Sequence, residues 1–217
     1  MGIGRREFLR QFGTAIATAA TPSSAIYVTG DQYVNRRLGI AFSKPTAWVF
    51  ADIQAMADVK EGQLLALDDP GLAQHIFDEA GLPIVTISKY GISKDSDHFT
   101  PGITIFLERI SPDDAIAVDG SPIDVLDADC QMNEEILRDF RVTSQPMSTS
   151  VSKCPSAQYV ASFMFEHANM TPTPVRMKTL YIDQLVASYT LRMYDSPHLG
   201  SEMTYDYKQF IDSFRLV

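Results

Sequence analysis

The chain has 217 residues, of which 45% are hydrophobic and 21% are charged, and this is the composition of an ordinary globular protein. Its formal net charge is −9 at pH 7, so nucleic acids and anionic membrane surfaces, which attract lysine and arginine, are not expected partners. Beyond residue 25 every apolar run is interrupted well before the length of about 18 residues that a transmembrane helix needs, so none is expected there.

The first 25 residues have the three parts of a secretory signal peptide. Three arginines lie near its start, and the weakly apolar segment 12–20, FGTAIATAA, follows. Small residues supply a cleavage site, either SSA ending at Ala25 or ATA ending at Ala19. The alternative is an amphipathic N-terminal helix, since the spacing of four apolar residues places them on one helical face: Phe8, Leu9, Phe12 and Ile16.

The segment RREFLR, residues 5–10, resembles the twin-arginine consensus R-R-x-F-L-K of bacterial Tat signals, and Arg5, Arg6, Phe8 and Leu9 carry the match. The resemblance implies export by the Tat machinery and a periplasmic or secreted protein. The expected organisation is therefore a signal peptide, 1–25, followed by one domain, 26–217.

The first elements of the expected domain are short. Apolar segments 38–42 and 48–50 flank a turn at 44–46, which predicts an opening hairpin. Asp69, Pro70 and Gly81 then suit the start and end of a helix over 69–81.

The middle of the chain predicts a second hairpin and a longer helix. Segments 83–91 and 102–110 are rich in β-branched residues and are separated by a polar loop, which favours a hairpin with a long connection. Residues 121–140 start with Ser-Pro and place apolar side chains at alternating spacings of three and four, which indicates an amphipathic helix with Cys130 on its inner face.

In the last third of the chain, apolar residues recur at every second position, which is the spacing of β-strands. Segments 159–167, 174–183 and 185–194 alternate and predict a three-stranded meander. Residues 204–217 return to helical spacing and supply a helix that can cover one face of these strands. Together the elements predict an α+β fold, an antiparallel β-sheet with helices packed on it.

Two segments resemble the PsbP/Mog1-like superfamily. GIAFSKPTAW at 39–48 is similar to its opening, and FIDSFRLV at 210–217 is similar to its terminal helix. The resemblance implies an α-β-α sandwich. That superfamily consists mainly of accessory and binding proteins and shares no catalytic motif that could be transferred to this chain.

Standard catalytic motifs are missing from the sequence, including G-x-S-x-G, H-E-x-x-H and the phosphate-binding G-x-x-x-x-G-K-[ST]. The most polar cluster is Asp95, Asp97 and His98, whose oxygens and imidazole could bind a divalent ion, although a solvated hairpin loop explains the same residues. We therefore expect no cofactor, assign no catalytic residue and keep this loop as a weak metal candidate.

The two cysteines, Cys130 and Cys154, leave three interpretations open: a disulfide, a buried thiol on the helix, or a nucleophile. An exported protein meets an oxidising compartment, so the disulfide is the preferred expectation.

Two functional hypotheses follow. The first is an exported, non-catalytic binding or accessory protein of the cell envelope, with another envelope protein as its partner. The second is an exported enzyme whose site is assembled from distant residues such as Asp97, His98 and His167.

Overall fold

The computed structural model describes residues 26–52, 63, 65, 83–92, 98–108, 121–168, 170–184, 187–200 and 202–217. The expected signal segment 1–25 and the predicted helix 69–81 lie outside them. The described residues form two antiparallel sheets, the α-helices α5 (Pro122–Ile136) and α6 (Glu202–Ser213), and a short 3-10 helix, η1 (Pro197–Leu199). None of the helices in this part of the chain has the length and apolar character needed to cross a membrane.

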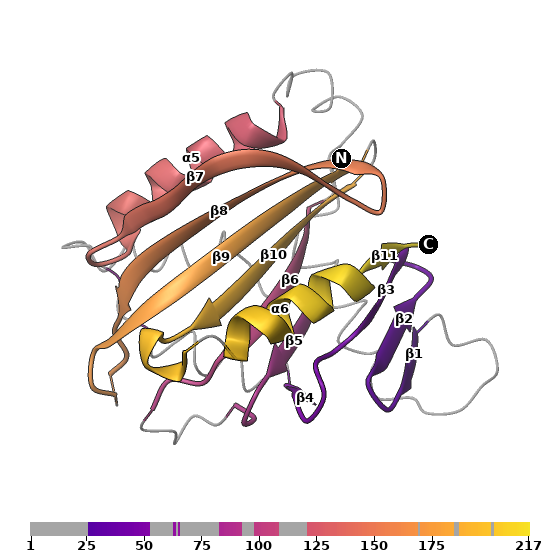
Figure 1. The fold of residues 1–217 in the computed structure, drawn as a ribbon, viewed down its shortest axis with the longest axis horizontal. Helices are drawn as coiled ribbons and strands as arrows, with labels where there is room; N and C mark the ends of the chain where they lie inside the picture. Colours follow the sequence, from indigo (N-terminus) through magenta and orange to yellow (C-terminus); the bar gives the residue numbers. More distant parts are fainter. Residues whose placement is uncertain are drawn as a thin grey trace, which may run out of the picture.

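Seven strands form the main sheet, and every neighbouring pair is antiparallel (Figure 1). In spatial order they are β4 (Val49–Phe50), β5 (Val85–Ser88), β6 (Gly102–Glu108), β10 (Ala187–Asp195), β9 (Thr173–Gln184), β8 (Cys154–Phe165) and β7 (Arg141–Val151). The predicted β5–β6 hairpin and the predicted meander, β8 to β10, are confirmed. The sequence does not predict β7, because RVTSQPMSTSV contains few apolar residues.

Four short strands form the second sheet, in the order β1 (Ile26–Thr29), β2 (Gln32–Asn35), β3 (Ile40–Ser43) and β11 (Arg215–Leu216). The last strand ties the end of the chain to its beginning, since the amide of Val217 donates to the carbonyl of Gly39 at 2.9 Å. The hydroxyl of Ser213 also donates to the carbonyl of Ser43, at 3.1 Å.

The predicted opening hairpin is wrong in its pairing, although both strands exist. β3 pairs with β2 and β11 of the small sheet, whereas β4 pairs with β5 of the main sheet. The chain crosses between the sheets because Trp48 is buried, with 2% exposure, and its indole nitrogen donates to the Asp206 carboxylate of α6 at 3.1 Å. The turn itself forms, since the amide of Trp48 donates to the carbonyl of Pro45 at 3.1 Å, but a partner far along the chain overrides the local strand pairing.

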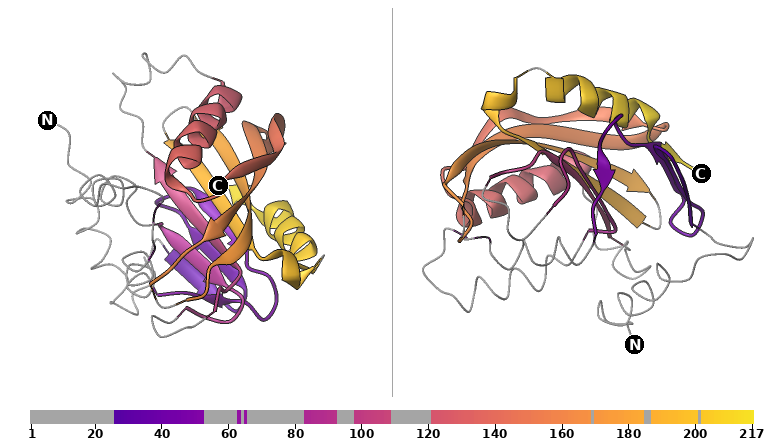
Figure 2. Two further views of the ribbon diagram at one scale, coloured as in Figure 1. Left: turned by 90° about the vertical axis from the view of Figure 1, so that its left-hand side faces the viewer. Right: turned by 90° about the horizontal axis from the view of Figure 1, so that it is seen from below.

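The two helices cover opposite faces of the main sheet (Figure 2). On one face, α6 packs its apolar stripe against the strand residues of one hydrophobic cluster, which include Leu180, Ile182, Tyr189, Leu191 and Met193. On the other face, α5 buries Leu126 over Ala157, Tyr159 and Ala161. The arrangement is an α+β sandwich with the antiparallel sheet between helices, as predicted.

The start of α5 follows directly from its sequence. Ser121 caps the helix, its side chain accepts from the amide of Asp124, and the Asp124 carboxylate accepts from the amide of Ser121. Pro122 occupies the first turn, where a missing N–H costs no hydrogen bond. The helix ends at Ile136, before the predicted residue 140, because Leu137 is extended.

Candidate functional site

Three strands of the main sheet carry a group of basic side chains on the face that α6 occupies. Residues 176, 178, 180 and 182 of β9 alternate onto this face, and Leu180 and Ile182 belong to the cluster beneath α6. Register pairs Arg176 with Ser162 and Lys178 with Val160, and on the next strand it pairs Ser162 with Arg141 and Val160 with Ser144. We call this surface the basic face and define it by five residues: Arg141, Ser144, Ser162, Arg176 and Lys178.

Neither α-helix covers the basic face, although the short helix η1 contacts β9. Figure 1 shows α6 in front of β5 and β6, whereas β7, β8 and β9 remain in view on the same side. Arg141 is exposed, and the other four residues of the basic face are half-buried. The face is therefore reachable from solvent.

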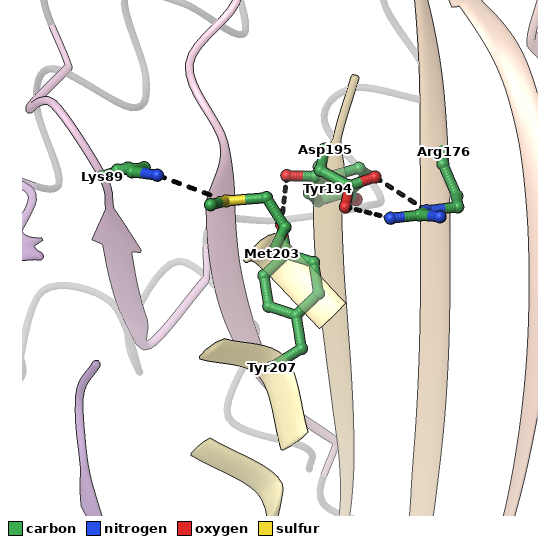
Figure 3. A network of polar contacts seen from close by, with 6 residues as sticks. All are labelled: Lys89, Arg176, Tyr194, Asp195, Met203 and Tyr207. Carbon is green, nitrogen blue, oxygen red and sulfur yellow. Dashed lines mark hydrogen bonds and ion pairs between the residues drawn. The ribbon is translucent and has the colours of Figure 1, made fainter. Parts of the chain in front are cut away.

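Arg176 is held in place by Asp195, which lies directly opposite it on β10 (Figure 3). Its Nε donates to Oδ1 at 2.9 Å and its Nη2 to Oδ2 at 2.5 Å, so the pair is bidentate. Asp195 is 1% exposed, whereas the Arg176 side chain is 40% exposed. Hydrogen bonding to Asp195 raises the pKa of Arg176, so its positive charge is permanent and fixed in position.

Helix α6 packs beside the Arg176–Asp195 pair, on the side of Asp195. The hydroxyl of Tyr207 donates to the carbonyl of Tyr194 at 2.6 Å, and burial raises the pKa of that phenol. Beyond it, the Lys89 ammonium lies 3.9 Å from the sulfur of Met203 (Figure 3). α6 therefore buries Asp195 and leaves the guanidinium of Arg176 at its edge.

Lys178 and Arg141 differ from Arg176 because neither forms a hydrogen bond or ion pair through its side chain with any described residue. Burial lowers the pKa of Lys178, which shows that the protein environment disfavours its charge. The basic face thus brings three cations onto one side of the sheet, and Asp195 pairs with one of them. Its chemistry suits an anion, and the serines beside the cations add hydroxyl donors.

The neighbouring sheet edge is less suited to binding. β7 is the outermost strand, but it contains Pro146 and its pairing with β8 shifts register between Val142 and Met147. Proline and bulges are features that protect edge strands against pairing with another strand. The basic face is thus a better binding surface than the edge beside it.

The metal candidates predicted from sequence are not brought together by the described residues. Asp95 and Asp97 lie outside them, and His98 is exposed. Within the described ranges, no cluster of three or more histidine, cysteine, aspartate or glutamate residues could hold a metal ion.

Of the three residues named for the alternative enzyme hypothesis, the structure describes His98 and His167. His167 is buried and stacks on Phe165 at 6.3 Å, and Phe165 packs on Phe99 at 5.6 Å. The stretch that begins at His98 therefore lies close to His167, whereas Asp97 is outside the described residues.

The cysteines are both free thiols in the structure, which differs from the preferred expectation of a disulfide. Cys130 packs against the cluster beneath α5, and Cys154 packs against the cluster on the α6 side, so the sheet separates them. Burial, together with Asp129 and Asp127, raises the pKa of Cys130 to about 11. At neutral pH this thiol stays protonated, which disfavours a role as nucleophile.

Sequence reasoning missed the basic face because its members come from three strands. The alternation in PVRMKTLYID places Arg176 and Lys178 on one side of a strand, and this signal was available. Arg141 could not be added, because β7 was not predicted and register between strands cannot be read from one sequence.

No family model and no curated protein matches the chain. Among solved structures, cyanobacterial PsbP (CyanoP) from Synechocystis is similar with a TM-score of 0.51 at 11% identity, over 93% of this chain and 99% of that chain. LpqN of Mycobacterium tuberculosis, described as involved in cell envelope biogenesis, has a TM-score of 0.46 at 12% identity, over 81% of this chain and 82% of that chain. The first similarity supports a PsbP-like fold, in agreement with the resemblance noted in the sequence.

Proposed function

We propose that the protein is an exported binding or accessory protein of the cell envelope, which holds an acidic segment of another envelope protein on its basic face. Export by the Tat machinery rests on the segment RREFLR and on the apolar and small residues that follow it. The binding role rests on the chemistry of the basic face.

The observation that carries the binding role is the pair of cations without partners. Lys178 is half-buried, its pKa is lowered by burial, and it has no carboxylate beside it in the described part of the chain. A carboxylate from a partner would favour the charged form of Lys178 and form a charge-assisted hydrogen bond with it. Arg141, whose side chain also has no partner among the described residues, extends the same requirement along the face.

The overall charge of the chain restricts the partner. A net charge of −9 repels extended polyanions, whereas a local group of cations attracts a short anionic segment. An acidic peptide segment meets this condition. Nucleic acid does not.

We propose a non-catalytic role because the thiol of Cys130 and the phenol of Tyr159 are both held in their protonated forms, which are poor nucleophiles. Burial raises the pKa values of the Cys130 thiol and of the Tyr159 phenol, so both stay protonated at neutral pH. Asp195 is occupied by Arg176.

A direct test uses the full chain and a fluorescent hexaglutamate peptide, followed by anisotropy. We expect binding that weakens as salt is added, and a dissociation constant about tenfold higher in the double variant Lys178→Gln, Arg141→Gln. Lys153→Gln removes one positive charge, half of the change in the double variant, from the exposed β7–β8 turn and serves as the control, with an expected change below about twofold. Equal binding by the double variant and the wild type would contradict the proposal.

The cellular partner is sought with the same variants. Affinity purification from envelope extract should recover one protein with the wild type and with Lys153→Gln, and lose it with the double variant. Recovery that is independent of Lys178 and Arg141 would place the partner surface elsewhere.

A further inference from the structure

The outer surface of α5 carries carboxylates, and the helix contains no lysine or arginine. Four acidic residues of the helix are exposed: Asp124, Asp127, Glu134 and Glu135. The Asp124 carboxylate is used by the cap of the helix. The other three form no ion pair with any residue in the described part of the chain. We call Asp127, Glu134 and Glu135 the acidic stripe.

The basic face offers opposite charges at a matching spacing. Arg141 and Lys178 lie two strands and two residues apart, which corresponds to a diagonal of about 12 Å. Asp127 and Glu135 lie eight residues apart on one side of α5, which corresponds to about 12 Å along the helix axis. Two cations without a partner can therefore each meet one of two carboxylates without a partner.

Each of the two surfaces also has an exposed methionine beside its charges. Met132 lies on α5 and Met147 on β7, and each is 48% exposed. Met147 pairs with Gln158 of β8, which alternates onto the same side of the sheet as Ser162. A flexible thioether side chain packs against surfaces of varied shape, so both residues can add apolar contact next to the charge pairs.

One copy of the chain cannot bring these two surfaces together, because they lie on opposite sides of the main sheet. The acidic stripe is on α5, which packs over Tyr159, whereas the basic face is on the side that α6 occupies (Figure 2). A contact between copies is therefore head to tail. Each copy presents its acidic stripe to one neighbour and its basic face to another.

The net charge of −9 does not prevent such a contact at moderate salt. At an ionic strength of about 0.1 M the Debye length is about 10 Å, so charges on the far sides of two copies are largely screened from each other. Charges that meet at the contact are screened less. Complementary local charge therefore outweighs the overall repulsion.

We propose that the acidic stripe of α5 docks on the basic face of a second copy of this chain, and that this contact repeats head to tail. The inference rests on the anion-binding chemistry proposed for the basic face, and it names a second occupant of that face. Self-association then competes with the envelope partner for Lys178 and Arg141. The chain thereby limits access to its own binding surface when its concentration is high.

Sedimentation velocity of the full chain measures the association directly. A contact made of a few exposed charge pairs is weak, so we expect an apparent dissociation constant of about 100 µM. The average mass should rise with protein concentration at about 0.05 M salt and return to that of a single chain at about 0.5 M salt.

Two double variants test the head-to-tail geometry. Asp127→Asn, Glu135→Gln removes carboxylates of the acidic stripe and keeps the basic face, whereas Lys178→Gln, Arg141→Gln does the reverse. Each variant alone should remain a single chain. An equimolar mixture should form dimers and nothing larger, because each dimer lacks the charges for the next contact. Formation of the mixed dimer also shows that both variants are folded.

The control is Glu108→Gln, Asp183→Asn, which removes two negative charges from another part of the main sheet, where Glu108 is exposed and Asp183 is half-buried. It should associate as the wild type does, which separates loss of the stripe from a change in net charge. A wild type that stays a single chain at about 500 µM and low salt overturns the inference. A mixture of the two double variants that does not associate overturns it as well.

Hexaglutamate binding separates failure of this inference from failure of the proposed function. Asp127→Asn, Glu135→Gln should bind the peptide as tightly as the wild type does, because its basic face is intact. A chain that binds hexaglutamate but never self-associates refutes the head-to-tail contact alone. A chain that does neither refutes the basic face as a site for anions.

Discussion

Arg176 and Asp195 face each other across β9 and β10 and form a bidentate ion pair whose carboxylate is buried and whose guanidinium reaches the protein surface. Replacing Arg176 by Gln leaves the carboxylate of Asp195 buried without its counterion. We expect the free energy of unfolding to fall by about 2 kcal/mol or more, which urea denaturation measures. Arg138→Gln, which breaks the more exposed pair with Glu166, should cost less than about 1 kcal/mol. Similar losses in both variants would show that the burial of Asp195 contributes nothing.

Tyr159 connects the sheet to α5 through its hydroxyl, which donates to Asp129 and accepts from Asn133. Tyr159→Phe removes one donor and one acceptor from a buried cluster, and we expect a loss of about 1–3 kcal/mol in the free energy of unfolding. Tyr205→Phe removes a hydroxyl from an exposed tyrosine of α6 and should change the stability by less than about 0.5 kcal/mol. Equal stability of Tyr159→Phe and the wild type would count against this link.

Cys130 should react slowly with a thiol reagent in the native protein. Its pKa is raised from 9.0 to about 11, so at pH 8 the thiolate fraction is about a hundredfold below that of an unperturbed thiol. Ellman's reagent, used on a Cys154→Ser variant with and without urea, measures the difference. Because the folded pKa is the higher one, this group also makes stability decline as pH rises from about 9 to 11. Equal rates in the folded and unfolded variant would contradict the raised pKa.

The separation of the two cysteines by the sheet predicts two free thiols in protein produced with its export signal. Alkylation in denaturant without reductant should add two adducts to the intact mass. A mass that accepts adducts only after reduction would instead establish the disulfide that the oxidising compartment favours.

The proposed signal segment, residues 1–25, makes a prediction that is independent of the fold. Changing Arg5 and Arg6 together to Lys should hold the precursor in the cytoplasm, because the match to the twin-arginine consensus rests on this pair. Cell fractionation with immunodetection measures the distribution, and Arg10→Lys, which restores the consensus residue, is the matched control. Normal export of the double variant would remove the Tat assignment.

The parts of the fold that depend on local chemistry were predictable from sequence. Ser121 and Pro122 determine where α5 begins, and the alternation in β8, β9 and β10 identifies the meander. The crossing of the chain at Trp48 was not predictable, because it depends on Asp206, which is 158 residues away. β7 was missed for a different reason, since its stability comes from pairing with β8 and not from an apolar pattern of its own.

The candidate site could likewise be predicted only where it depends on local sequence and not on strand pairing. Alternation along β9 places Arg176 and Lys178 on one face, but Asp195, which fixes one of them, is identified only by strand register. A row of polar residues across the opposite face is less visible still, since register sets single residues of five strands opposite one another: Thr86, Thr104, Arg192, Thr179 and Tyr159. Sites made across strands require the pairing before their chemistry can be recognised.

β11 joins two distant parts of the chain into one sheet. This strand consists of Arg215 and Leu216, and the other strands of its sheet lie within residues 26–43. Without residues 215–217, β3 has an open edge and the hydrogen bond from Val217 to Gly39 is lost. Unfolding of these three residues alone would therefore expose a strand edge that can pair with another chain.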